Sequence, residues 1–166
     1  KTHESLLKTD TQPYHLHVAM LLLGAKGSGA KPLTNAPAGG NITAVQLAKF
    51  RDQPLLGEAV TISVSWQADG KEQRCRLEGL VRNRKTKAPM TKGDFTFTGS
   101  QMWQGQYVAQ TEGSIVSAIT DPDAVFNNPR PGRDADDTWH LDPKSLPPLG
   151  TKLQVTITLV GKETKP

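Results

Sequence analysis

The sequence contains a single cysteine, Cys75, among its 166 residues. One thiol excludes a disulfide within the chain, and it excludes a zinc ion or iron–sulfur cluster held by several cysteines of the chain. Long apolar runs are also missing. The longest lies between Leu16 and Gly24, far short of the ~20 residues that span a bilayer. We therefore expect no transmembrane segment in this chain.

Motifs that mark particular chemistries are absent as well. The stretch from Gly24 to Lys31 is rich in glycine, but it lacks the Gly-Lys-Ser/Thr of a phosphate-binding loop and follows an expected helix. His15-x-His17 cannot chelate a metal from one helix face, and His-x-x-x-His spacing does not occur. Ser100 has no Gly-x-Ser-x-Gly elbow around it. We predict neither a cofactor nor a metal site.

Glycine and proline are abundant, with 15 and 12 residues, which predicts many turns and a strand-rich fold with loops. An apolar content of 36% with 22% charged residues suits a globular protein, and the length fits one domain with its own core. We predict a single α+β domain over residues 1–160, followed by a frayed tail at 161–166.

The residues from 13 to 23 predict one helix around which the strands are organised. Pro13 suits the first helical turn, because its missing N–H would have had no partner there. Gly24 suits the left-handed residue beyond the last turn. Apolar residues occupy nearly every face, which is typical of a buried helix. We expect a mostly antiparallel, twisted sheet of about five to seven strands packed on this buried helix.

Alternation of apolar and polar residues predicts the clearest strands. Val60–Trp66 alternates strictly, and the Asp69-Gly70 pair that follows is typical of a tight hairpin turn. Alternation resumes over Gln73–Val81 with Cys75 inward, so this cysteine is predicted to be a core residue and not a nucleophile. The residues expected to face outward in this second strand are Arg74, Arg76 and Glu78.

Further strands are expected at Phe95–Phe97 and Leu153–Leu159. A second hairpin is predicted from Gln106 to Thr120, with its turn at Glu112-Gly113. Asp121–Pro148 is predicted to be a long polar loop, and loops of that length inside a compact domain are often functional or mobile.

Charge is distributed unevenly, although the net charge is only +4. Eight lysines and arginines lie between Lys71 and Lys92, and six aspartates lie between Asp121 and Asp142. Such polarity can steer a charged partner, but two solvated loops of opposite sign are the simpler interpretation. Nucleic acid is not predicted as a partner, because the nearby aromatic residues are assigned to the core and leave few stacking platforms.

Candidates for ligand or partner binding are the aromatic residues of two loops and two arginines of the basic loop. They are Trp103, Tyr107, Trp139, Arg82 and Arg84. Trp103 and Tyr107, four residues apart beside Gly105, would form an exposed lip, although each aromatic residue also suits a loop anchor packed on the core. Asp134, Asp136 and Asp137 offer the oxygen ligands that calcium prefers but lack the EF-hand spacing, and a solvated acidic loop explains them more simply.

A hydrolase is the alternative function that the residues leave open. Its site would join His3 or His140 as base with Ser100 as nucleophile and Asp121 as the residue that orients the base. Nothing in the sequence brings these side chains together, so the preferred prediction is non-catalytic.

Four segments, in this order along the chain, resemble one family. They are KTHESLL at residues 1–7, the apolar stretch Leu16–Gly24, FTGS at Phe97–Ser100 and PPLGTK at Pro147–Lys152. Together they resemble the bacterial YdjY-type domain, found in exported or lipoprotein-like proteins of planctomycetes and related bacteria. The resemblance implies an extracytoplasmic location, periplasmic or lipoprotein-anchored, and the family has no established activity.

We therefore predict a non-catalytic extracytoplasmic binding or assembly module. Its contacts would come from the Trp103–Tyr107 turn and the Asp121–Pro148 loop. Its partner would be another protein or chain. Relatives have residues before the HESLL segment, so a strand missing from the start of this chain would leave a sheet edge open to pairing.

Overall fold

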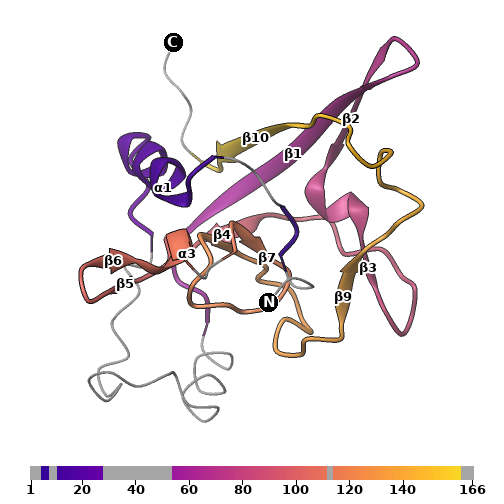
Figure 1. The fold of residues 1–166 in the computed structure, drawn as a ribbon. Coiled ribbons are helices and arrows are strands. Elements are labelled where there is room, and N and C mark those ends of the chain that lie inside the picture. The colour runs from indigo at the N-terminus through magenta and orange to yellow at the C-terminus, as the bar shows by residue number, and fades with distance from the viewer. Residues whose placement is uncertain (1–4, 8–10, 28–53, 112–113, 162–166) are drawn as a thin grey trace.

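The structure, a computed structural model, describes residues 5–7, 11–27, 54–111 and 114–161 (Figure 1). It is an α+β fold in which a curled, mostly antiparallel sheet accompanies one long helix. The predicted fold class is confirmed. Several expectations lie outside the described residues, namely His3, the end of the glycine-rich stretch from Gly24 to Lys31, the turn at 112–113 and the tail at 162–166.

The helix α1, Pro13–Leu22, begins and ends as the sequence predicts. Pro13 occupies the first turn, and the chain leaves the helix through Gly24 with φ at 84°. The prediction that this helix is buried on all sides is wrong. Among the described residues of α1, Met20 is the fully buried one, whereas Leu21 is 44% and Leu22 is 83% exposed.

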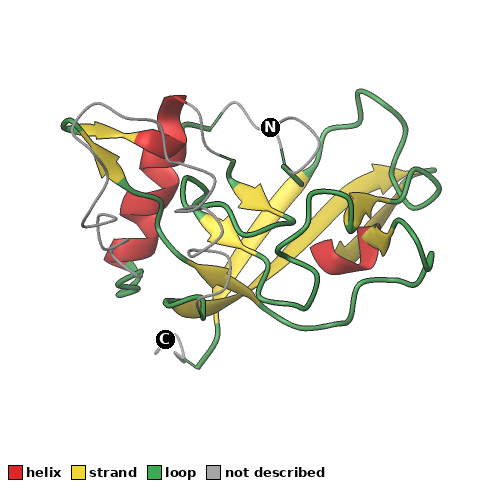
Figure 2. Cartoon of the chain, turned by 90° about the horizontal axis from the view of Figure 1, so that it is seen from below, coloured by secondary structure: helices red, strands yellow, loops and turns green. Residues whose placement is uncertain are grey.

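The position of α1 explains this exposure. Figure 2 shows the helix at one end of the long strands. Its aromatic contacts lie on a single face and are with β6, Gln106–Tyr107, and β4, Phe95–Phe97. Tyr14 meets Tyr107 edge-on with 6.0 Å between ring centroids. Residues 114–128, in contrast, are buried throughout. The apolar composition of this helix therefore does not determine which of its faces are buried.

The first predicted hairpin is confirmed. Strand β1, Glu58–Ala68, pairs antiparallel with β2, Lys71–Arg76, and Asp69 and Gly70 form the turn with φ at 50° and 72°. Both turn residues are left-handed, as a two-residue hairpin loop requires. The inward residues of β1 are buried as the alternation predicts, and they are Val60, Ile62 and Val64.

The second strand of that hairpin is shorter than predicted. It stops at Arg76 and gives way to a 3₁₀ turn η1, Leu77–Leu80, which is followed by β3, Val81–Asn83. Because side chains in a 3₁₀ turn no longer alternate between two faces, Glu78 is not directed outward. It is buried, with 2% of its surface exposed.

Strand β1 is the centre of the main sheet, whose order is β10-β1-β4-β8-β7, with β2 as a further partner of β1. The predicted last strand is confirmed as β10. The other strands of this sheet are β4, Phe95–Phe97, β7, Val116–Ser117, β8, Phe126–Asn127, and β10, Gln154–Leu159. In the part of the chain that the structure describes, β7 and β8 form the one parallel pair.

Two small sheets flank the main one, and Figure 1 shows them on opposite sides of the molecule. One pairs β3 with β9, Trp139–Leu141, and the other pairs β5, Met102–Trp103, with β6, Gln106–Tyr107. The second pair replaces the predicted hairpin from Gln106 to Thr120. Gln104 and Gly105 are both left-handed and make the tight turn, after which Val108–Thr111 forms the short helix α3.

Candidate functional site

Ser100, the candidate nucleophile, follows β4 in a left-handed conformation with φ at 58°. Its side chain is buried, and its hydroxyl is held by backbone groups on both sides. The Oγ donates a hydrogen bond to the carbonyl of Asp123 at 2.7 Å and accepts one from the N–H of Ala109 at 3.1 Å. A strained conformation can mark an active site, but here the hydroxyl fastens two loops to each other.

Asp121 lies in the same buried loop region and also bonds to the backbone. Its Oδ1 accepts a hydrogen bond from the N–H of Asp123 at 2.9 Å. The Asn127 side chain completes this loop, since its Oδ1 accepts from the Asp121 N–H at 2.7 Å and its Nδ2 donates to Thr98 Oγ1 at 2.8 Å. These bonds explain how a segment predicted to be a polar surface loop is buried from its start.

Of the two histidines proposed as bases, the structure describes only His140, which it does not bring to Ser100 and Asp121. His140 lies in β9, which pairs with β3 in a separate sheet, and His3 lies outside the described residues. A different histidine, His17, lies close by, with its ring 5.1 Å from the Tyr107 ring and 5.6 Å from the Phe97 ring. One signal in the sequence could have indicated that His17 faces the core. It lies three residues before the apolar Met20 and therefore on the same face of the helix.

The surroundings of His17 favour the neutral form of its imidazole. Burial lowers the pKa of His17, and a hydrogen bond with the Gly99 backbone acts in the opposite direction. Tyr107 is buried beside it, donates its hydroxyl proton to the Gly99 carbonyl at 3.0 Å, and has its pKa raised by burial. Tyr107 is therefore a core residue, and the prediction that it lines an exposed lip is wrong.

The other binding candidates are scattered. The Trp139 indole is half-buried and donates to the Pro131 carbonyl at 3.2 Å, as a loop anchor does. Arg84 is exposed at the surface beside β3. Trp103 lies in β5, and its side chain is outside the described part of the structure. Cys75 is partly buried, and burial, followed by the charge of Glu78, raises the pKa of its thiol. A raised pKa disfavours the reactive thiolate.

Arg82, the remaining candidate, is paired internally. Its Nε donates to Asp142 Oδ2, and the same carboxylate accepts hydrogen bonds from the Ser145 hydroxyl at 2.9 Å and the Lys144 N–H at 3.2 Å. The Arg82 bond is the largest cause lowering the pKa of Asp142 to about 2, and the Ser145 bond is the next.

Replacing Arg82 by glutamine will raise the pKa of Asp142 from about 2 toward the ordinary aspartate value of ~3.9. Because the folded pKa is the lower one, the interaction stabilises the fold above pH ~4, and this stabilisation is lost as the pH falls toward 2. Carbon-detected NMR of the aspartate carboxyls measures the titration. Arg84→Gln is the matched control and leaves the Asp142 pKa unchanged. An Asp142 pKa that does not move in Arg82→Gln would contradict the assignment.

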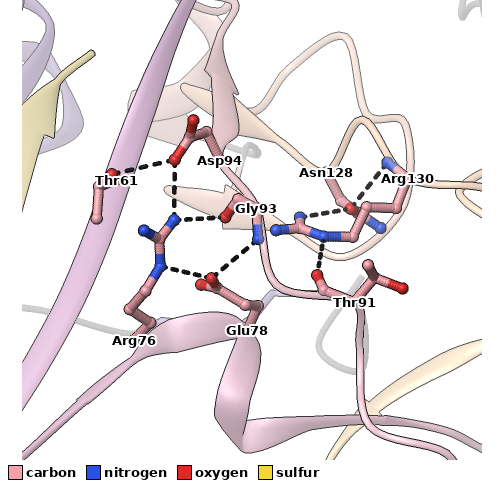
Figure 3. A network of polar contacts seen from close by, with 8 residues as sticks. All are labelled: Thr61, Arg76, Glu78, Thr91, Gly93, Asp94, Asn128 and Arg130. Atoms are coloured by element: carbon pink, nitrogen blue, oxygen red, sulfur yellow. Dashed lines mark hydrogen bonds and ion pairs between the residues drawn. The ribbon is translucent and has the colours of Figure 1, made fainter.

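A partly buried ionic network surrounds Glu78 and Arg76 (Figure 3). Glu78 Oε1 accepts hydrogen bonds from Arg76 Nε at 2.5 Å and from the Gly93 N–H at 3.2 Å. Arg76 Nη2 donates to the Gly93 carbonyl at 2.6 Å and to Asp94 Oδ1 at 2.8 Å. The Thr61 hydroxyl donates to the same Asp94 oxygen at 3.1 Å. The network thereby ties β1, β2 and η1 to the segment before β4.

Arg130 extends this network from the loop after β8. Its Nε donates to the Thr91 carbonyl at 2.6 Å, its Nη1 donates to Asn128 Oδ1 at 3.1 Å, and its guanidinium carbon lies 4.9 Å from the Phe95 ring centroid. Figure 3 shows the guanidinium directed toward the side where Glu78 lies. Burial lowers the pKa of Arg130, and the charge of Glu78 opposes that effect most strongly. The network therefore has a structural role. It includes Arg76 from the basic segment Lys71–Lys92 and Arg130 from the acidic segment Asp121–Asp142.

Metal ligands do not converge in the described residues, where no group of three His, Cys, Asp or Glu side chains could hold an ion. Asp134, Asp136 and Asp137 are exposed, and Asp137 lies 3.3 Å from Lys85 Nζ. Within the same described residues, no helix has the length and apolar character needed to cross a membrane.

Comparison with known proteins gives one match. A family model described as the YdjY domain matches residues 1–158. No curated protein and no solved structure shows a significant match. The family resemblance seen in four sequence segments is confirmed by this match, which spans the strands and the loops described above.

Proposed function

The chain belongs to the YdjY domain family, and we propose that it serves as a non-catalytic binding or assembly module outside the cytoplasm. The location is what the family resemblance implies, since the domain is found in exported or lipoprotein-like proteins. One observation carries the non-catalytic part of the proposal. The hydroxyl and carboxylate that an acyl-transfer site would use bond to loop backbone instead.

The chemistry of acyl transfer explains why this observation matters. A serine nucleophile needs a base within hydrogen-bond reach and an approach for the substrate carbonyl. Ser100 is 5% exposed, its proton is directed at the Asp123 carbonyl, and His140 belongs to another sheet. The hydrolase with His3 or His140, Ser100 and Asp121 therefore remains the alternative, and the module is the better supported function.

The exposed parts of the two predicted contact segments are available for a partner. Met102 is 60% exposed in the β5–β6 hairpin, whose turn residues Gln104 and Gly105 are exposed as well. In the second segment, Asp134, Asp136 and Asp137 are exposed, and Asp137 lies beside the basic loop through its ion pair with Lys85. We propose a protein partner for these surfaces.

Native mass spectrometry of the purified protein tests this proposal. We expect the chain to carry no metal and to form non-covalent assemblies with another polypeptide, which include assemblies with itself. A stoichiometric zinc ion on the chain would overturn the proposal, because a bound zinc supplies an activated water and makes a hydrolase the better account.

A further inference from the structure

Three strands border the main sheet, and two of them are protected. The N–H of Leu6 donates to the Val116 carbonyl at 2.9 Å, and Ser5 bridges to Ser117, so the N-terminal segment covers β7. Strand β2 reads KEQRCR, and its four charged residues are a common protection against pairing with another chain. Strand β10, the third border, has neither kind of protection in the described residues.

The sequence of β10 suits strand pairing. It reads QVTITL, with no charge, proline or glycine, and half of its residues are apolar. Val155, Ile157 and Leu159 lie opposite the buried Val64, Ile62 and Val60 of β1, so they continue the core face of the sheet. This apolar face extends to the border, where Val155 is 39% and Leu153 is 43% exposed.

The backbone of β10 is also available. The Val160 N–H donates to the Ala59 carbonyl at 2.9 Å. Because hydrogen-bonded residues alternate along an antiparallel pair, the even-numbered residues bond toward β1 and the odd-numbered ones direct their N–H and C=O groups outward. Val155, Ile157 and Leu159 are thus the outward residues, and no described strand pairs with them. Such a row of donors and acceptors is a template for an added strand.

The same stretch is self-complementary, which identifies the partner. From Leu153 to Leu159 the residue types are symmetric about Thr156. In a two-fold interface, if one residue of the first copy faces a second residue of the other copy, the same two residues also face each other with the copies exchanged. Pairing about Thr156 sets Val155 against Ile157 and Leu153 against Leu159 of the other copy. Apolar residues then meet on the core face, and the outward backbone groups of odd residues meet in register.

Charge is compatible with this register. Lys152 would face Val160 of the second copy, so the lysines of the two copies lie at opposite ends of the new ladder. Like charges directly opposite each other are destabilising, and the register about Thr156 sets no two like charges opposite each other within Lys152–Val160.

We propose that two copies of this chain associate through antiparallel pairing of their β10 strands about Thr156, which joins their sheets. This inference rests on the proposed function and deepens it by naming a second copy as a partner. It requires no rearrangement of the pairing between β1 and β10.

Sedimentation velocity of the whole chain tests the proposal with charges placed at the two-fold axis. Thr156 is exposed and would face Thr156 of the second copy. We expect a wild-type dimer, and we expect Thr156→Lys to raise its dissociation constant about fivefold or more by setting two lysines side by side. Thr158→Lys, exposed on the same face but opposite Gln154, is the control and has a smaller effect. Circular dichroism checks that each variant is folded.

Charge reversal gives the decisive comparison. Thr156→Glu alone should weaken the dimer as Thr156→Lys does, and an equimolar mixture of the two variants should restore it. A wild-type chain that is monomeric at every concentration, or a dimer that Thr156→Lys leaves intact, would overturn this pairing. Neither result excludes a different polypeptide as the partner, so the proposed function fails instead on a stoichiometric zinc ion.

Discussion

Replacing Glu78 by glutamine lowers the free energy of unfolding by about 3 kcal/mol, the lower end of the range for breaking a buried ion pair. Glutamine keeps an oxygen for Arg76 and for the Gly93 N–H, so the loss is that of the charge. Arg76 is 29% exposed and can be hydrated in part, which limits the effect. Arg130 is buried and loses the carboxylate that offsets its desolvation. Urea denaturation followed by circular dichroism measures the change.

Glu72→Gln is the matched control for this experiment. Glu72 is an exposed residue of the same hairpin, and surface substitutions of this kind change stability within about 0.5 kcal/mol. Equal stability of the Glu78 and Glu72 variants would show that the ionic network does not hold these segments together.

Replacing Gly57 by alanine has a still larger expected effect. Gly57 precedes β1 with φ at 138°, and a Cβ there would lie 2.0 Å from the backbone carbonyl oxygen of Phe97. That oxygen belongs to β4 in the centre of the sheet and cannot rotate away as a side chain can. We expect a loss of more than about 4 kcal/mol. Because whole domains are stable by only roughly 5–15 kcal/mol, this loss removes a large part of the total, and urea denaturation followed by circular dichroism measures it.

Gly79→Ala controls for the loss of a glycine. A Cβ at Gly79 meets nothing within 4 Å, and its backbone is not left-handed. We expect its stability to lie within about 0.5 kcal/mol of the wild type. A Gly57→Ala variant that folds as stably as Gly79→Ala would contradict the close approach of the chain before β1 to β4.

The sequence predicts those parts of the fold that depend on neighbouring residues. The ends of α1, the Asp69-Gly70 turn and strand β10 follow from a proline, a turn dipeptide and alternation, which act within a few residues. The burial of Glu78 is different. It depends on a 3₁₀ turn that interrupts the strand pattern and on Arg76 and Gly93, which approach from other parts of the chain.

The same distinction applies to the candidate site. Residue types selected Ser100 and Asp121, and the structure places both in one buried loop region. Their hydrogen bonds to backbone groups depend on how that region folds, and no local sequence pattern encodes this folding. For the same reason, part of the buried segment 114–128 is predicted from the sequence to be a polar loop. The Asn127 side chain forms its hydrogen bonds to the Asp121 backbone only once this segment is folded. The uncharged character of β10 is visible in the sequence, but its place at the border is not.

Labelling of the native protein with a fluorophosphonate probe, followed by peptide mapping, tests most directly whether its buried polar residues serve structure and not catalysis. These probes react with serine hydroxyls that a base has activated. The hydroxyl of Ser100 is bonded to Asp123 and Ala109, so we predict no adduct at this residue. A stoichiometric adduct on Ser100 in the folded protein would contradict the account and establish the hydrolase in its place.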